Sequence, residues 1–175
     1  RDRYLSVSLD IVDEMNQIVL EILSLSSVQE LAGDKEWIQL DQVLEQILDQ
    51  YKVLAQSRSL TIDNQIPDKA VYMDPAILKL VLSNVISNAV KHSDAGGEIQ
   101  LRLEEEGTHL AVENTSQEMV ETAEMPMTAS RQKKEGGLGL FVVQHLLDHE
   151  ELAYQFDKTA MGLRFCMELP KDPQE

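Results

Sequence analysis

The chain has 175 residues, 43% of them hydrophobic, and a formal net charge of −16. This length and apolar content suit one full domain with an appended element, whereas the acidic balance argues against a surface for nucleic acid or anionic lipid. No stretch approaches the roughly twenty apolar residues of a transmembrane helix, and the single cysteine, Cys166, excludes an intramolecular disulfide and suits a reducing cytoplasm.

The first 28 residues contain neither Gly nor Pro and predict one long helix. Apolar residues recur on it at spacings of four and three, at Ile11, Met15, Ile18, Ile22 and Leu25. This seam favours packing in a bundle or against a second copy; the alternative is an amphipathic helix packed on its own domain. The pattern breaks at Ala32-Gly33-Asp34, so we expect units at 1–32 and 33–175. Because the sequence starts at Arg1 rather than Met, we expect a piece of a longer protein.

Strand and helix patterns alternate through the second unit. Residues 116–136 are polar and irregular and predict a loop. The predicted strands are 37–40, 60–66, 70–73, 98–107, 109–115, 152–156 and 163–169, and the predicted helices are 41–56, 75–93 and 138–150. Adjacent strands clustered between three helices favour an α/β two-layer sandwich, preceded by the long helix, over an alternating parallel sheet.

Two asparagines interrupt the apolar stripe of the helix that begins at Pro75. Asn84 and Asn88 lie one turn apart on one face, and Lys91 follows on the same face. Asparagine is unfavourable inside a helix, but its amide oxygen is a suitable ligand for Mg²⁺ shared with phosphates, and a lysine would neutralise phosphate charge. The alternative is that one asparagine caps a backbone group and the other is solvated.

A glycine-rich turn, "KEGGLGLFVV" (134–143), precedes and enters the last helix. Its glycines allow close backbone approach, and the N–H groups at a helix start form an anion site. The turn comprises Gly136, Gly137 and Gly139, with Leu138 and Leu140 anchoring the helix. Its combination with the asparagine helix is more specific for nucleotide binding than either motif alone.

These motifs resemble those of sensor histidine kinases. "MDPAILKLVLSNVISNAVKHS" resembles the asparagine box of that family, "GGLGLFVV" resembles its second glycine box, and "YLSVSLDIVDEMNQIVLEILSLSSVQE" is similar to the second helix of its dimerisation and histidine-phosphotransfer hairpin. The resemblance implies the Bergerat ATP-binding fold, which type II topoisomerases and mismatch-repair ATPases share.

The resemblance also implies roles for individual residues. Asn88 would ligate the Mg²⁺ that bridges the phosphates of ATP, with Asn84 supporting the same site. Lys91 would contact phosphate, and His92 would lie beside the nucleotide. Gly137 and Gly139 would line the triphosphate at the hinge of the lid, and Gly136, Leu138 and Leu140 complete the implied nucleotide-binding set.

The adenine end of the site departs from the family pattern. Asn114 stands where the family has an Asp that accepts a hydrogen bond from adenine, a form that resembles some Gram-positive sensor kinases. Ser116 and Glu118 replace both glycines of the first glycine box. The lid reads "AEMPMTAS", Glu135 replaces the first glycine of the second box, and "GLRF" (162–165) stands where many relatives have Gly-Thr-Thr-Phe. These departures predict reduced ATP affinity.

None of the four histidines lies in a segment like the family's phosphoacceptor helix. His145 and His149 are one turn apart, but without a third ligand we expect two solvent-facing side chains rather than a metal site. The phosphoacceptor is therefore expected outside this sequence.

The resemblance implies a protein-histidine kinase domain that uses ATP and Mg²⁺. The γ-phosphoryl would pass to a histidine and then to a response regulator, in a cytoplasmic domain of a membrane-anchored dimer. Two alternatives remain: a serine kinase of the anti-sigma-factor type, against which the leading helix argues, and a degenerate domain that no longer binds ATP and acts as a dimerising scaffold.

Overall fold

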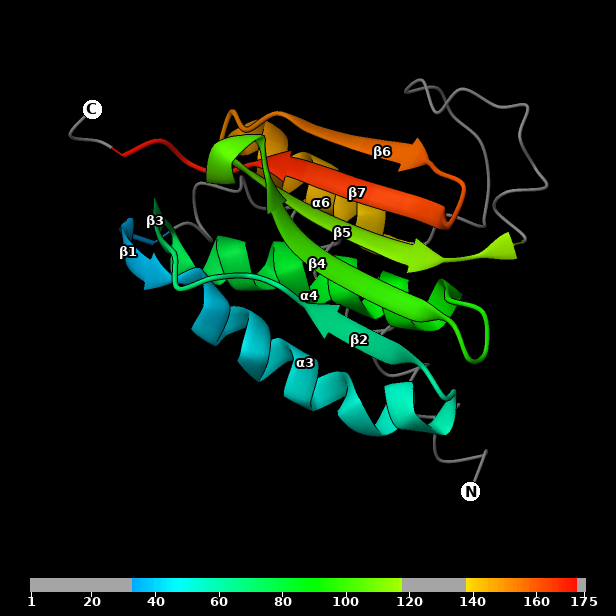
Figure 1. Cartoon of the computed structure of the whole chain (residues 1–175). Coiled ribbons are helices and arrows are strands. Elements are labelled where there is room, and N and C mark those ends of the chain that lie inside the picture. The colour runs from blue at the N-terminus through cyan, green and yellow to red at the C-terminus, as the bar shows by residue number, and fades with distance from the viewer. Residues whose placement is uncertain (1–32, 118–137, 173–175) are drawn as a thin grey trace.

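The computed structural model describes residues 33–117 and 138–172 (Figure 1). The expected helix within 1–32, the expected loop from Glu118 onward and the glycines at 136 and 137 lie outside these residues. The elements are β1 (Glu36–Gln39), α3 (Leu40–Ser57), β2 (Thr61–Asn64), β3 (Ala70–Met73), α4 (Pro75–His92), β4 (Glu98–Glu104), a 3₁₀ turn η1 (Glu105–Gly107), β5 (His109–Thr115), α6 (Leu138–His149), β6 (Tyr154–Lys158) and β7 (Gly162–Glu168).

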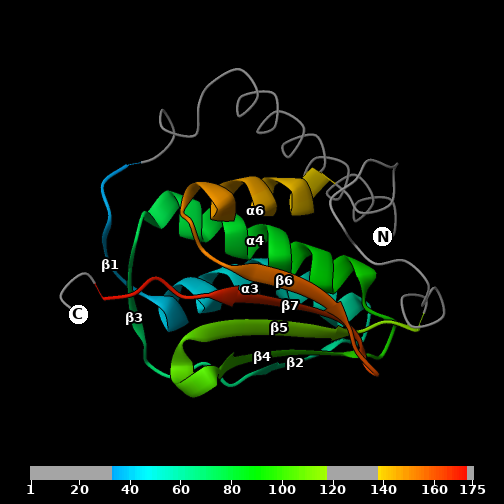
Figure 2. The same cartoon turned by 90° about the horizontal axis from the view of Figure 1, so that it is seen from above.

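Helices α3, α4 and α6 form one layer over a five-stranded sheet (Figure 2). The strand order is β2-β4-β5-β7-β6, in which β2 and β4 run parallel and the other neighbours antiparallel. Strands β1 and β3 pair antiparallel as a separate two-stranded ribbon. The α/β two-layer sandwich predicted for this part of the chain is confirmed.

The core lies between the sheet and the helices. Side chains alternate along each strand, so every second residue of β4, β5 and β7 is turned towards the helix layer. Helix α4 packs against α3, α6 and β5, which explains why its apolar residues extend around most of its circumference. The buried apolar residues contributed by the strands and by α4 include Ile99, Leu101, Leu110, Val112, Phe165, Met167, Leu78, Leu82 and Ile86.

Both ends of α4 are capped by side chains. At the start, Asp74 Oδ1 accepts hydrogen bonds from the backbone N–H of Ala76 (2.7 Å) and Ile77 (3.2 Å), as the sequence predicts for an Asp-Pro helix start. At the other end, the Arg58 guanidinium donates to the carbonyl oxygens of Val90 (3.0 Å), Lys91 and Ser93. A cation at a helix C-terminus satisfies carbonyl groups that lack a partner in the helix.

Some predicted bounds were wrong at their ends. Leu40 begins α3 rather than ending the first strand. The strand predicted for 98–107 ends at Glu104, because Glu105 and Glu106 adopt left-handed backbone conformations with φ of 48° and 58°. Glu151, with φ of 57°, ends the turn after α6, and β6 therefore starts at Tyr154 rather than at residue 152.

Candidate nucleotide-binding site

The first turn of α6 packs directly on the asparagine face of α4. A β-carbon built on Gly139 would lie 2.8 Å from Asn84 Oδ1 and 3.6 Å from Asn88 Nδ2. Asn84 is only 4% exposed, and its Nδ2 donates to the carbonyl oxygen of Leu80 at 2.8 Å. Glycine at 139 therefore allows an approach to Asn84 that any side chain would obstruct.

Polar atoms in this region are buried without protein partners. Among the described residues, neither Asn88 Nδ2 nor Ser87 Oγ has a hydrogen-bond partner. Buried polar groups in native proteins are almost always satisfied, so such atoms call for a bound group or ordered water. An amide carries both an oxygen acceptor and an NH₂ donor, and Asn88 can offer either one. The amide oxygen of Asn88 therefore fits as a ligand of a hydrated metal ion that is shared with phosphates.

Asn114 lies near the carboxyl end of β5, on the face of the sheet that the helices cover. It is in register with Ile99 on β4 and Leu163 on β7, and it shares that face with the buried residues Leu110 and Val112. Its side chain is 4% exposed, and its Nδ2 has no hydrogen-bond partner in the part of the chain that the structure describes. An amide at this position can read the hydrogen-bonding edge of a base.

The residues that follow Asn114 are held by hydrogen bonds from two neighbouring segments. On one side, Asp94 donates from its N–H to the carbonyl oxygen of Thr115 (2.9 Å), and its Oδ2 accepts from the N–H of Gln117 (2.7 Å). On the other, the N–H of Ser116 donates to the carbonyl oxygen of Met161 (2.9 Å). Sequence reasoning missed Asp94; its place directly after the asparagine helix was the available signal.

For the remaining predicted site residues, the structure gives the burial and the position in the helix. Lys91 is half-buried and His92 exposed in the last turn of α4, and Leu140 is half-buried in the first turn of α6. Leu138 begins α6. The structure thus brings Asn84, Asn88 and Gly139 together at one site.

The two histidines of α6 are both exposed. The ring of His145 stacks on that of Phe141, with centroids 6.3 Å apart and planes inclined by 3°. Within 33–117 and 138–172, no three His, Cys, Asp or Glu side chains are grouped to hold a metal ion.

Ion pairs cross the opposite face of the sheet. Arg102 bonds Glu104 (2.9 Å) and Glu113 (3.0 Å), while Arg164 bonds Glu104 and Asp157 (3.1 Å). Burial opposes the ionised form of Glu104, but the hydrogen bonds from Arg164 and Arg102 outweigh it and lower the pKa of Glu104. This network ties four strands together on the side away from the helices.

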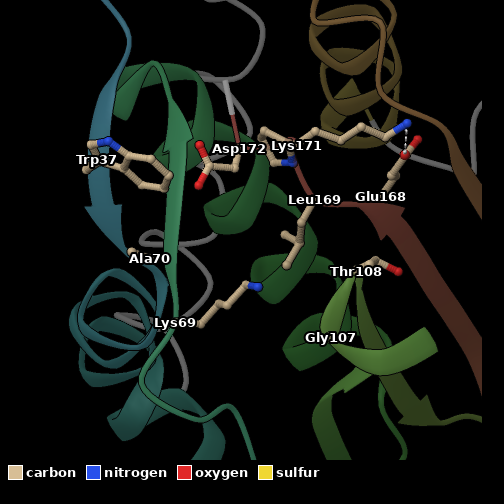
Figure 3. A pocket seen from close by; sticks show the side chains of 10 residues that line it. Trp37, Lys69, Ala70, Gly107, Thr108, Glu168, Leu169, Lys171 and Asp172 are labelled. Carbon is tan, nitrogen blue, oxygen red and sulfur yellow. Dashed lines mark ion pairs between the residues drawn. The ribbon is translucent and has the colours of Figure 1, made fainter. Parts of the chain in front are cut away.

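A cavity of about 260 Å³ lies between the β1–β3 ribbon and the end of β7, with the side chain of Lys69 directed into it (Figure 3). Gly107 and Thr108 also line it, and they precede β5, whereas Asn114 is near the other end of that strand. The cavity is therefore separate from the candidate nucleotide site.

Comparison with known proteins decides the family. Residues 73–173 match the family described as histidine kinase-, DNA gyrase B-, and HSP90-like ATPase. The chain belongs to this ATPase family. The matching span contains α4, β5 and α6, which carry Asn84 and Asn88, Asn114 and Gly139 of the candidate site.

Similar proteins within the family are sensor kinases. The chain is 31% identical to sensor histidine protein kinase HK06 of Streptococcus pneumoniae over 95% of its own length and 39% of that protein. It is 29% identical to sensor protein VanSB of Enterococcus faecalis, over 96% of its own length and 41% of that protein. The chain therefore spans about two fifths of the length of these relatives. The predicted resemblance to the catalytic domains of sensor histidine kinases is confirmed.

A solved structure shows the same fold. The histidine kinase AdeS of Acinetobacter baumannii superposes with a TM-score of 0.69 at 22% identity, covering 97% of this chain and 85% of that one. In the described residues, no helix is both long and apolar enough to cross a membrane.

Proposed function

We propose that this ATPase-family chain binds MgATP and acts as the catalytic domain of a sensor histidine kinase. The observation that carries the proposal is the close approach of Gly139 to the two asparagines of α4, which leaves no room for a side chain at 139, in a chain whose residues 73–173 match the family. The buried Nδ2 atoms of Asn88 and Asn114 have no hydrogen-bond partner among the described residues, which supports a ligand that spans from metal to base.

The metal end of the site comprises the asparagine face. Asn88 would ligate Mg²⁺, with Asn84 beside it held by Leu80 and Gly139. Bound there, Mg²⁺ would neutralise charge on the phosphates. Lys91 would add a positive charge and His92 would lie beside the nucleotide. Backbone groups from Gly136 to Leu140 would receive the phosphate oxygens at the start of α6.

The adenine end of the site depends on Asn114. Its buried amide would accept a hydrogen bond from the adenine amino group through Oδ1 and could donate through Nδ2, which has no partner within 33–117 and 138–172. A neutral amide is a weaker acceptor than the carboxylate it replaces. This end is therefore expected to contribute less affinity than the metal end.

The catalytic contribution would be positioning and charge neutralisation. The terminal phosphoryl group would leave ATP, releasing ADP, and form a bond to a ring nitrogen of a histidine on a separate helix. A response regulator would then receive it on an Asp. Residues 1–32 would pair with a second copy in a cytoplasmic assembly anchored to a membrane.

Calorimetric titration of the chain with a non-hydrolysable ATP analogue tests the binding. With Mg²⁺ present, we expect Asn88→Ala to weaken affinity by at least about tenfold, the size of effect typical of a perturbed metal site, and to abolish the gain that Mg²⁺ gives. Asn64→Ala, an exposed asparagine at the end of β2, is the matched control.

Two results would overturn the proposal in different ways. Absence of binding at millimolar nucleotide would favour the scaffold function, and equal Mg²⁺ dependence in wild type and N88A would remove the metal assignment. If binding holds, a histidine-bearing helical hairpin added with γ-labelled ATP should acquire an acid-labile label. Label on serine instead would favour the serine-kinase alternative.

A further inference from the structure

Glu113 is a buried carboxylate beside the proposed adenine-reading residue. It lies on β5 immediately before Asn114, but its side chain is on the opposite face of the sheet and is 6% exposed. Arg102 Nη2 donates to its Oε2 at 3.0 Å, and the hydroxyl of Thr159 donates to its Oε1. Burying a carboxylate costs free energy unless it is paired and hydrogen-bonded, so the loss of either partner would leave Glu113 in an unfavourable state.

Thr159 closes the turn between β6 and β7. Its hydroxyl oxygen accepts from the N–H groups of Met161 and Gly162, each at 3.2 Å, while its own N–H donates to the carbonyl oxygen of Gly162 at 2.9 Å. Because its hydroxyl also donates a hydrogen bond to Glu113, this side chain links the turn to the central strand β5. Figure 1 shows the turn beside the carboxyl end of β5.

The same turn packs tightly on the backbone around Asn114. A β-carbon on Gly162 would lie 2.2 Å from the carbonyl oxygen of Asn114 and 2.4 Å from the nitrogen of Ser116. The N–H of Ser116 in turn donates to Met161. Any displacement of the turn must therefore move the backbone that carries Asn114.

We propose that Glu113 and Thr159 are positioning residues, which hold the turn at Met161–Gly162 against β5 and thereby fix the amide of Asn114 for the base. The inference rests on the proposed ATP binding. The hydrogen bond between Glu113 and Thr159, here called the clamp, would thus hold the carboxyl end of β5 from the outer face of the sheet. In this chain Ser116 occupies the first glycine position of the adenine motif.

Thr159→Val tests the clamp, because it removes the hydroxyl and keeps the shape of the side chain. In the full 175-residue chain we expect the affinity for the ATP analogue to fall about threefold to tenfold, the size of effect of one lost hydrogen bond. The preference for the ATP analogue over the matching GTP analogue should narrow, because the base-reading amide is no longer fixed.

Several variants isolate the effect. Thr159→Ser retains the hydroxyl and should recover both affinity and base preference. Thr108→Val removes a hydroxyl that bonds Glu105 and His109 in its own turn, at the other end of β5, and this variant should bind nucleotide as wild type does. Glu113→Gln, compared with Glu104→Gln on the same arginine, provides a second route if T159V folds poorly.

The outcomes separate this inference from the proposed function. Wild type that binds no nucleotide removes both. Binding by wild type with an unchanged base preference in T159V and E113Q overturns the positioning role alone, even where thermal stability falls. A narrowed preference that T159S restores supports the clamp.

Discussion

Gly139 and Asn84 are the two residues on which the packing of the metal end depends. A methyl group at 139 would lie 2.8 Å from Asn84 Oδ1, closer than a β-carbon is normally found to any atom. Because Asn84 is buried and bonded to Leu80, it cannot easily move away. We expect Gly139→Ala to cost about 1–3 kcal/mol in the free energy of unfolding, as overpacking does, and to weaken nucleotide binding.

Urea unfolding of a double-mutant cycle tests this contact. In an N84A background the obstruction is gone, so G139A should become neutral or stabilising, since alanine is favoured over glycine in a helix by about 1 kcal/mol. The coupling between the two sites should be large because they are in direct contact. An equal cost of G139A in both backgrounds would show that the destabilisation arises elsewhere.

At the scale of elements, the ion pairs on the outer face join β4, β5, β6 and β7. Glu104 lies between two arginines, and its pKa is lowered in the folded state. Its contribution is therefore present above the pKa of the unfolded chain and is lost as pH falls through the folded value. We expect Glu104→Gln to cost about 1 kcal/mol or less at pH 7, the range of solvent-screened pairs.

The sign of the pH dependence is the decisive measurement. The difference in urea midpoint between wild type and E104Q should be largest at neutral pH and shrink as pH falls below 4.5, the ordinary pKa of this carboxyl. Glu106→Gln is the control, because Glu106 is exposed and forms no ion pair within the described residues. A difference that stays constant from neutral to acidic pH would show that the charge of Glu104 contributes nothing.

The sequence predicts the individual helices and strands more clearly than it predicts which strands pair. Periodicity placed α4 because apolar residues and an Asp-Pro start coincide there. Alternation identifies the buried face of a strand but not the strand beside it. The parallel pairing of β2 with β4 could therefore not be predicted, nor could the antiparallel pairing of β3 with β1 rather than with the large sheet. Leu40 fits both a strand end and a helix start, which explains the error there.

The same limit applies to the site. Asn84 and Asn88 were visible because polar side chains interrupt an apolar helix. Glu113 and Thr159 were not, because they are 46 residues apart and each is ordinary in its own segment. Only the pairing of β5 with β7 brings the turn to the carboxylate. The residues alone suggested that the asparagine helix and the glycine turn belong to one site, but the close approach of Gly139 to Asn84 was not predicted.

At the scale of the whole molecule, a net charge of −16 on 175 residues opposes compaction by self-repulsion. The ion pairs on the sheet act in the other direction, but they are few and partly exposed to solvent. Salt screens both effects, and the Debye length falls from about 30 Å at 0.01 M to about 10 Å at 0.1 M. Because repulsion acts over longer distances than the contact pairs, screening should remove more repulsion than attraction.

We therefore expect the urea midpoint at pH 7 to rise as NaCl increases from about 0.01 M to 0.1 M, the interval over which screening changes most. Circular dichroism would follow unfolding, with a chelator present so that adventitious divalent cations do not bind. Sucrose, which stabilises proteins without screening charges, provides the comparison. It should raise the urea midpoints of wild type and E104Q equally. Sodium chloride should stabilise E104Q at least as much as wild type, because that variant has lost an attraction that salt would weaken. A midpoint that falls with salt would mean that the short-range pairs of the sheet outweigh the repulsion of the whole chain.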